Sequence, residues 1–175
     1  ALLKATKTMK YDSTMYVRFY VKTTIGDYTN HSYLTRKFNV VNSAPSISPT
    51  VIDTNDVTKT LTGDNTKLVK YYSNAQFTVN ATPKKQGSIT SIYVRNGSQS
   101  SSSASGTFNG VTSASTSFSV TDSRANNVQQ TITSKWVEYI KLTNNLENER
   151  PNISGSMTVR ATGQYFNGSF GVTNN

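Results

Sequence analysis

The sequence has no cysteine, a single histidine, only four prolines and no long apolar run. Without cysteine there is no disulfide framework and no thiol chemistry, and one histidine alone cannot complete a tetrahedral zinc site. No apolar run approaches the roughly 18 residues that cross a bilayer, and the opening ALLKATKTMK is too polar for a signal peptide. We therefore expect no disulfide-stapled scaffold, no metal or other cofactor, and no membrane insertion.

Acidic residues are also scarce, with 9 Asp and Glu against 18 Lys and Arg, so the net charge is +9. Such an excess can attract nucleic acid or an anionic surface such as a cell wall. The basic residues are scattered, and neither a basic helix nor an aromatic RNA-binding motif accompanies them. We expect a solvated basic surface and no nucleic-acid partner.

Short segments with alternating apolar and polar residues recur throughout, whereas helical periodicity is hard to find. Although hydrophobic residues make up only 34% of the chain, ten Tyr, seven Phe and one Trp can supply a core. The pattern predicts an all-β fold built from immunoglobulin-like antiparallel β-sandwich modules in tandem. The expected strands cover residues 15–23, 32–41, 75–82, 88–96, 116–123, 130–143 and 154–162.

Two internal repeats support modules in tandem. FYVKTTIGDYTNHSYLTRKF, from Phe19 to Phe38, aligns with FSVTDSRANNVQQTITSKW, from Phe118 to Trp136. The spacing of about 100 residues is the length of one immunoglobulin-like domain. FTVNATPKKQGS, beginning at Phe77, is similar to MTVRATGQYFNGS, which begins at Met157. The spacing of this second repeat, 157 − 77 = 80 residues, is shorter than that of the first.

The repeats predict three parts. Residues 1–43 are the C-terminal strands of a partial module, 44–141 a complete module, and 142–175 the N-terminal strands of a further partial module. Proline-containing joints are expected at 42–49 and 143–152, and both ends of the sequence are interpreted as cuts through a longer tandem. Within the complete module, the serine-rich stretch 96–110 favours a long mobile loop or ragged edge over a linker.

Catalytic chemistry has few candidates. His31 is the only imidazole and is expected in a hairpin turn, and no G-x-S-x-G elbow suggests a nucleophile for it. Two acid pairs could in principle hydrolyse glycosides, Asp53 with Asp56 and Glu147 with Glu149. Both pairs are interpreted as lying in or beside joint segments, where acids are normally solvated. We predict that the protein is not an enzyme.

Loops rich in Asp and Asn are interpreted as turns. DTND (53–56) and TGDN (62–65) lack the spacing of a calcium-binding loop, although a weak calcium site stays open. In TDSRANN (121–127), Arg124 is expected to pair with Asp122 at the surface, an interaction worth at most about 1 kcal/mol. The natural hairpin residues of that segment are Asp122, Ser123, Asn126 and Asn127.

Several aromatic residues could stack on sugars, namely Trp136, Tyr139, Tyr71, Tyr72, Tyr165 and Phe166. Trp136 occupies the repeat position of Phe38, which favours a core anchor over a binding platform. Tyr71 and Tyr72 are adjacent, so in a strand one would point inward and the other outward, and the outward one is a binding candidate. Tyr165, Phe166 and Phe170 are expected as core or joint residues. No ligand-binding residue is assigned beyond these.

Four stretches of the chain, taken together, resemble one protein family. They are TLTGDNTKLVKYYSNAQFTVNA (60–81), TFNGV with SFSVTDSRANN (107–127), VEYIKLTNNLE (137–147) and VRATGQYFNGSFGVTNN (159–175). They are similar to the immunoglobulin-repeat minor structural tail proteins of siphophages that infect streptococci and related Gram-positive cocci. The resemblance covers most of the chain from about residue 45. Ala125 departs from it, because the family's turn is expected to carry a glycine after DSR.

The resemblance implies a virion component in the tail fibre or tip, acting as a spacer or in attachment to the host surface. The implied partners are other tail proteins and, for attachment, host cell-wall carbohydrate or a surface protein. The alternative is an immunoglobulin-like stalk or adhesin module at a bacterial cell surface, which a sorting signal in the reading frame would indicate. Unpaired strands of the partial modules are expected to pack on the central module or to pair between molecules as a homo-oligomer.

Overall fold

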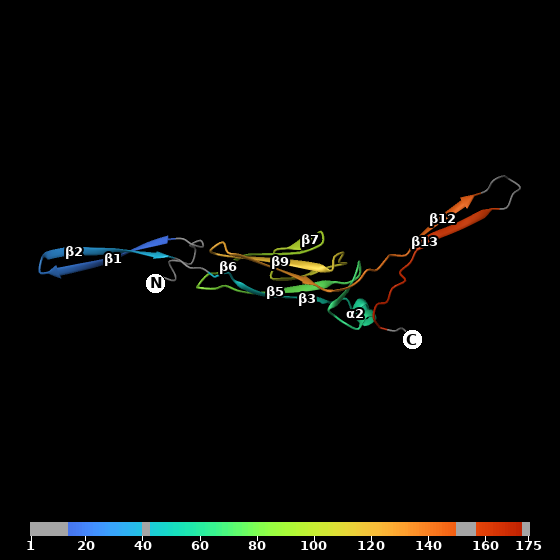
Figure 1. The fold of residues 1–175 in the computed structure, drawn as a ribbon, viewed down its shortest axis with the longest axis horizontal. Coiled ribbons are helices and arrows are strands. Elements are labelled where there is room, and N and C mark those ends of the chain that lie inside the picture. Colours follow the sequence, from blue (N-terminus) through green and yellow to red (C-terminus); the bar gives the residue numbers. More distant parts are fainter. Residues whose placement is uncertain (1–13, 40–42, 150–156, 173–175) are drawn as a thin grey trace. The chain divides into compact units, whose positions relative to one another are not determined.

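A computed structural model describes residues 14–39, 43–149 and 157–172. Its elements are strands apart from one short helix, so the all-β prediction is confirmed (Figure 1). The chain divides into two compact units, each assembled from separate stretches. The first draws on residues 1–48, 79–93 and 118–130, and the second on 49–78, 94–117 and 131–175.

A long antiparallel hairpin opens the described chain. Strand β1 (Thr14–Ile25) pairs along its whole length with β2 (Tyr28–Asn39). The turn between them is Gly26–Asp27, where Gly26 has φ +55°, a left-handed conformation that glycine adopts without steric cost. We call this hairpin the N-terminal ribbon.

Two sheets bury their inward faces. The three-stranded sheet has the order β3-β5-β8 and the four-stranded sheet the order β10-β9-β6-β7. The first is formed by β3 (Ser46–Asp53), β5 (Ala75–Thr82) and β8 (Ser105–Phe108). The second is formed by β6 (Ile89–Asn96), β7 (Gln99–Ser101), β9 (Ser115–Asp122) and β10 (Asn127–Thr133).

Two further strand pairs belong to the second unit. β4 (Lys67–Val69) and β11 (Lys135–Val137) run parallel, an exception to the antiparallel pairing expected from the sequence. β12 (Thr143–Glu149) and β13 (Thr158–Gln164) pair antiparallel, and we call them the C-terminal ribbon.

The helix α2 (Asp56–Thr62) was not expected. The side chain of Asn55 caps its start by accepting from the backbone N–H of Val57 and Thr58, at 3.0 and 3.4 Å. Gly63 ends it in the left-handed conformation, with its N–H bound to the carbonyl of Lys59 at 2.8 Å. Seven residues are too few to show a helical period, so Asn55 and Gly63, the two capping residues, are the only sequence features that could have predicted this helix.

The core follows the alternation of the strands. Along β5 and β9 every second residue is buried, as a half-buried strand requires. In the second unit the rings of Phe77 and Phe108 stack with centroids 4.9 Å apart. The buried apolar residues are Val79, Phe118 and Val120 in the first unit, and Val51, Leu68, Val69, Ala75, Phe77, Val94, Phe108, Val111 and Val137 in the second. Within the described ranges no helix has the length and hydropathy to cross a membrane.

The sequence expectations about loops are only partly right. The serine-rich stretch 96–110 is no long loop but contains two short edge strands, since β7 pairs with β6 and β8 pairs with β5, which agrees with the alternative of a ragged edge. The expected joint at 42–49 already contains the start of β3, and the joint at 143–152 contains β12. The predicted strand at 130–143 breaks at Ser134 and ends as β11. Pro151, expected in the second joint, lies outside the described residues.

Candidate functional site

A buried carboxylate anchors the start of α2. Asp53 is 1% exposed, and its Oδ1 accepts from the backbone N–H groups of Asn55 and Asn74, both at 3.0 Å. Its Oδ2 accepts from the hydroxyls of Thr58 at 2.5 Å and Ser73 at 2.6 Å. One side chain therefore ties the helix to the turn that follows β4. The expectation that Asp53 is solvated is wrong, because four donors replace its water.

Asp56 has a different environment from Asp53. Its side chain is 93% exposed and contacts Lys59 at 2.7 Å one turn later on the helix. A hydrogen bond from Lys59 and its positive charge lower the pKa of Asp56. One acid is a structural anchor and the other a surface ion pair, so the glycosidase interpretation of this pair has no support.

The helix cap also positions an aromatic cluster. Asn55 donates through Nδ2 to the carbonyl of Tyr72 at 2.8 Å. The ring of Tyr72 meets the ring of Tyr139 edge to face, with centroids 5.1 Å apart, a favourable aromatic geometry. Tyr139 further contacts Phe166 at 5.2 Å and Phe170 at 6.1 Å between centroids.

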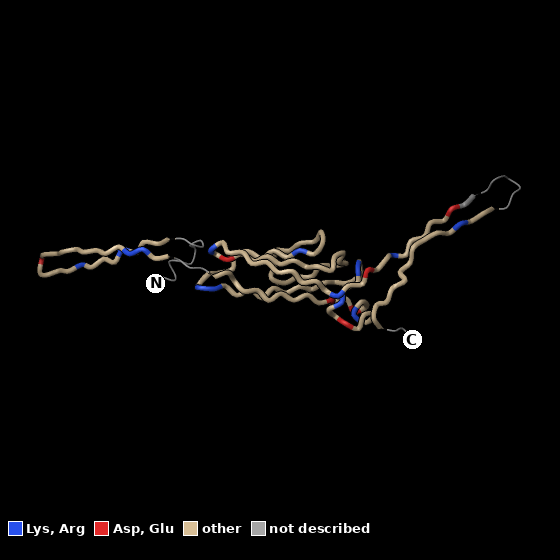
Figure 2. Tube along the Cα trace, in the orientation of Figure 1, with Lys and Arg blue, Asp and Glu red and all other residues tan. Residues whose placement is uncertain are grey.

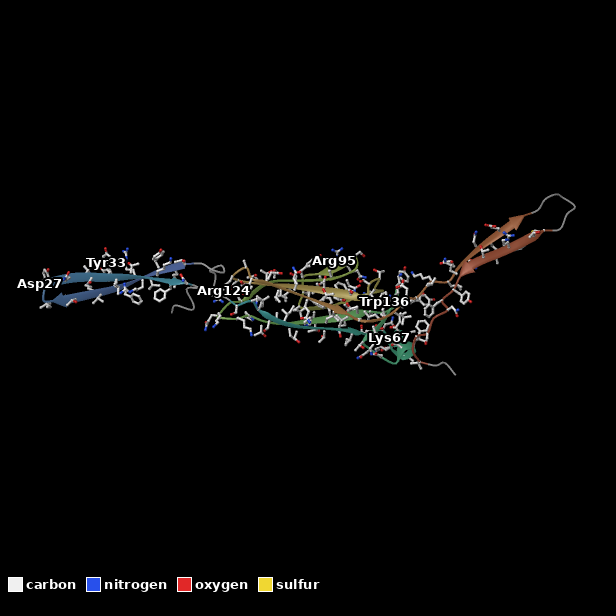
Figure 3. The ribbon with its side chains drawn as sticks, in the orientation of Figure 1. Asp27, Tyr33, Lys67, Arg95, Arg124 and Trp136 are labelled. Atoms are coloured by element: carbon white, nitrogen blue, oxygen red, sulfur yellow. The ribbon has the colours of Figure 1, made fainter. Side chains whose placement is uncertain are left out.

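The segment after the C-terminal ribbon completes the cluster. The rings of Phe166 and Phe170 lie 4.9 Å apart, and Lys67 donates through Nζ to the carbonyl of Phe170 at 2.8 Å. Both phenylalanines are half-buried, as expected for joint residues, whereas Tyr165 is 68% exposed and does not fit that expectation. Figure 3 labels Lys67 where this segment returns to the helix.

An apolar hollow of about 490 Å³ opens between α2 and the cluster. The polar groups of Asn55 and Thr58 on its wall are already bonded within the protein. The hollow therefore offers aromatic and aliphatic surface, which suits an apolar ligand or the C–H face of a sugar ring. We call it the aromatic hollow. Its lining is Asn55, Val57, Thr58, Leu61, Val69, Tyr72, Tyr139 and Phe170.

Charged side chains flank the cluster. Lys70 forms an ion pair with Glu138, which also accepts from Trp136 Nε1 at 2.7 Å. The hydrogen bond from Lys70, and then that from Trp136, lower the pKa of Glu138, and the same carboxylate raises the pKa of Lys70. Burial raises the pKa of the Tyr139 phenol, and Tyr72 beside it adds to the effect.

Trp136, Tyr71 and Tyr72 do not lie as expected. Trp136 is half-buried with its indole N–H on Glu138, so it is not a core anchor. Tyr71 and Tyr72 follow β4 in a turn, with Tyr71 at φ +70°, and both rings are exposed. Lys141 Nζ lies 4.7 Å from the centre of the Tyr71 ring, within the range of a cation–π interaction. Strand alternation does not apply to this pair.

The turn after β9 is a buried polar network. Asp122 and Arg124 are each 2% exposed, so the expected surface pair is wrong. Asp122 Oδ1 accepts from the N–H groups of Arg124 and Asn126, both at 2.9 Å. Arg124, which is labelled in Figure 3, donates through Nη1 to the carbonyl of Lys84 at 3.0 Å and through Nη2 to that of Lys85.

Burial alone would raise the pKa of Asp122, yet its net shift is downward. Hydrogen bonds from the Asn126 side chain and from the N–H groups of Asn126 and Arg124, together with the charge of Arg124, outweigh burial. The turn residue Ala125 has φ +63°, where a side chain is strained and glycine is not. The position therefore has the geometry for which a glycine was expected. Asn127 is on the first position of β10, and its amide donates to Ser119 Oγ at 2.8 Å.

The remaining candidates do not converge. His31 lies within β2 opposite Lys22, not in the turn, and its ring is 5.2 Å from that of Tyr20. Glu147 is opposite Arg160 in the C-terminal ribbon, and Glu149 lies two residues further along β12. Among residues 14–39, 43–149 and 157–172 no three His, Asp or Glu side chains gather in a group that could hold a metal ion.

The sequence singled out four residues that meet in or beside the aromatic hollow, Tyr72, Tyr139, Phe166 and Phe170. It missed the role of Asp53 and Asn55, for which the only local signal was Asn before a short polar run with Gly63 at its end. Comparisons with protein families, with curated protein sequences and with solved structures gave no match to this chain.

Proposed function

We propose that the chain is a non-enzymatic structural module of a phage tail, built from immunoglobulin-like β-sandwich modules and acting in spacing or in attachment to the host surface. One observation carries the proposal: each copy of the sequence repeat contains two neighbouring strands. Phe19–Phe38 lies in the hairpin β1–β2, and Phe118–Trp136 runs from β9 through its neighbour β10 into β11, which pairs with β4. A sequence repeat at a spacing of about a hundred residues is typical of tandem β modules.

The second repeat supports the same proposal. Phe77 lies in β5, and Met157 stands directly before β13. The residues that follow them, TVNAT and TVRAT, are strand in both places. Because both repeats place strand residues at matching positions, they support a tandem of sandwich modules.

The aromatic hollow favours attachment over spacing alone. Tyr72, Tyr139 and Phe170 present ring surface beside a shallow apolar wall. Cell-wall carbohydrate, one of the two attachment partners implied by the family resemblance, has C–H faces that such rings can cover. The net charge of +9 would strengthen contact with an anionic wall at low ionic strength.

Attachment is tested by binding of the labelled chain to walls purified from streptococci. Saturable binding that falls at least tenfold in Tyr72→Ala supports attachment through the hollow. The matched control is Tyr93→Ala, since Tyr93 has a similar exposed fraction but lies on β6 away from the hollow lining. No saturable binding by the intact chain would leave the spacer role only. Release of reducing ends from the walls would refute the non-enzymatic proposal.

Membership of a tail is tested by electron microscopy with an antibody against the chain. Labelling of purified phage tails supports the proposal. Labelling of the bacterial surface in cells that carry no phage would support the alternative, a stalk or adhesin module at the cell surface.

A further inference from the structure

The aliphatic and Phe side chains of the N-terminal ribbon gather on one of its two faces. Opposed residues of an antiparallel pair share a face, and β1 is opposed to β2 in the order Val17–Arg36, Phe19–Leu34, Val21–Ser32 and Ile25–Tyr28. One face therefore holds Thr23, Asn30, Ser32 and Arg36 together with an apolar set, Met15, Val17, Phe19, Val21, Ile25, Tyr28, Leu34 and Phe38. These side chains are half-buried at most, and several are largely exposed. We call this set the N-terminal apolar face.

On the opposite face of the same ribbon, side chains contact one another. The guanidinium of Arg18 lies 4.7 Å from the centre of the Tyr33 ring, and Tyr20 contacts His31. The polar and charged residues of this opposite face can stay in water. Exposure to solvent is unfavourable for the N-terminal apolar face.

The sequence repeat says what normally covers that face. Phe19 and Val21 align with Phe118 and Val120, which are 1% and 0% exposed in β9. In the ribbon the same two positions are 48% and 61% exposed. The N-terminal apolar face is thus the inner face of a sandwich whose other sheet is not supplied by the described residues of the first unit.

The C-terminal ribbon has the complementary features. Met157 and Val159 align with Phe77 and Val79 of β5, which are 1% and 4% exposed, yet here they are 62% and 50% exposed. Leu146 is opposed to Ala161 on the same face as Val159. We call Met157, Val159, Ala161 and Leu146 the C-terminal apolar face. It corresponds to the inner face of the sheet that contains β5.

Charge disfavours one alternative contact. The N-terminal ribbon with its turn contains four Lys and Arg and one Asp (Figure 2), and the sequence 143–164, strands and connecting segment together, contains two Glu and two Arg. The net positive charge therefore disfavours pairing of the N-terminal ribbon with itself, whereas the C-terminal ribbon has no net charge and adds no such repulsion.

We propose that the N-terminal apolar face of one molecule binds the C-terminal apolar face of a second copy, so that two ribbons form a composite sandwich between chains. Phe19 and Val21 take the places of Phe118 and Val120, and Met157 and Val159 those of Phe77 and Val79. The contact is heterologous, because two different surfaces meet. An open assembly of any size keeps one ribbon of each kind free at its ends, so copies continue to add until a ring closes, or a filament grows.

The test is sedimentation velocity of the intact chain over a range of concentrations. The proposal requires the mass to rise above the 19.2 kDa of one chain as concentration increases. Val21→Lys and Val159→Lys each remove one of the two faces, so each variant alone is expected to stay at 19.2 kDa. Tyr20→Lys is the matched control. Tyr20 is next to Val21 in β1, so its side chain lies on the opposite face of the ribbon, and this variant should assemble like the parent chain.

Mixing the two single variants distinguishes this contact from any other. Val21→Lys keeps an intact C-terminal ribbon and Val159→Lys keeps an intact N-terminal ribbon, so an equimolar mixture should stop at twice the mass of one chain. A parent chain that stays monomeric would overturn the proposal. Assembly of Val21→Lys alone, or failure of the mixture to dimerise when both variants keep the parent circular-dichroism spectrum, would also overturn it.

Discussion

Removing the Asp53 carboxylate by Asp53→Ala tests whether this residue anchors α2. The substitution takes the acceptor from four donors, the N–H groups of Asn55 and Asn74 and the hydroxyls of Thr58 and Ser73. Hydrogen bonds to a charged acceptor contribute about 1.5–3 kcal/mol each, and an unsatisfied buried donor costs about 1–3 kcal/mol.

The four losses are not independent, because the donors can find water once the helix loosens. At about 1 kcal/mol for each donor the free energy of unfolding falls by roughly 4 kcal/mol. Asp53→Asn keeps one acceptor oxygen and the side-chain volume, so its loss should be nearer 1–2 kcal/mol, about that of one or two hydrogen bonds. The order of stability should be parent, then Asn, then Ala.

The assay is urea unfolding followed by the fluorescence of Trp136, the only tryptophan, with circular dichroism as a second probe. Asp56→Ala is the control, because Asp56 is three residues away but exposed, and it should lose far less stability than Asp53→Ala. If Asp53→Ala unfolded at the same urea concentration as Asp56→Ala, the anchoring role would be refuted.

Three further results are expected. Ala125→Gly should raise the free energy of unfolding by about 0.5–1 kcal/mol, because φ +63° strains alanine and not glycine, and a loss of stability in urea unfolding would contradict this. Gly106→Ala should lower the free energy of unfolding by about 1–3 kcal/mol, since the new Cβ would lie 2.9 Å from Cζ of the buried Phe77, and a neutral result would show that the ring can move. The pKa of Asp122 is lower in the folded chain than its unfolded value of about 3.9, so its contribution is present above about pH 4 and is lost as the pH falls through the folded pKa. Urea midpoints between pH 6 and pH 2 should therefore fall less steeply in Asp122→Asn than in the parent chain, and equal slopes would argue against the shift.

The strands were predictable where one face is buried along several residues. In β5 and β9 buried residues alternate with more exposed polar residues, and this pattern predicted both strands to within one residue. β3, β4, β7, β8 and β12 were missed. Pro49, the serines of 96–110 and the asparagines of β12 have low strand propensity, and β4 is only three residues long. Short strands are held by their partners, so their own composition says little about them.

The candidate site was predictable in its residue types and not in its arrangement. Tyr72 and Tyr139 stand out as aromatics, but they are 67 positions apart and only the fold brings them together. Asp53 was expected in water because two of its donors, Ser73 and Asn74, lie about 20 residues away. Burial of a polar group depends on such distant partners, and no local pattern reports them.

The parallel pair β4–β11 has a consequence for the order of folding. It joins Leu68 to Trp136, so almost the whole intervening chain must be in place before the pair can form. Closing so long a loop is slow, because the chain loses conformational entropy before the contact between the two strands stabilises it. During synthesis the edge at Leu68 and Val69 therefore waits unpaired until β11 has emerged. Pulse-labelled amide exchange during refolding should therefore detect protection of Val137 late.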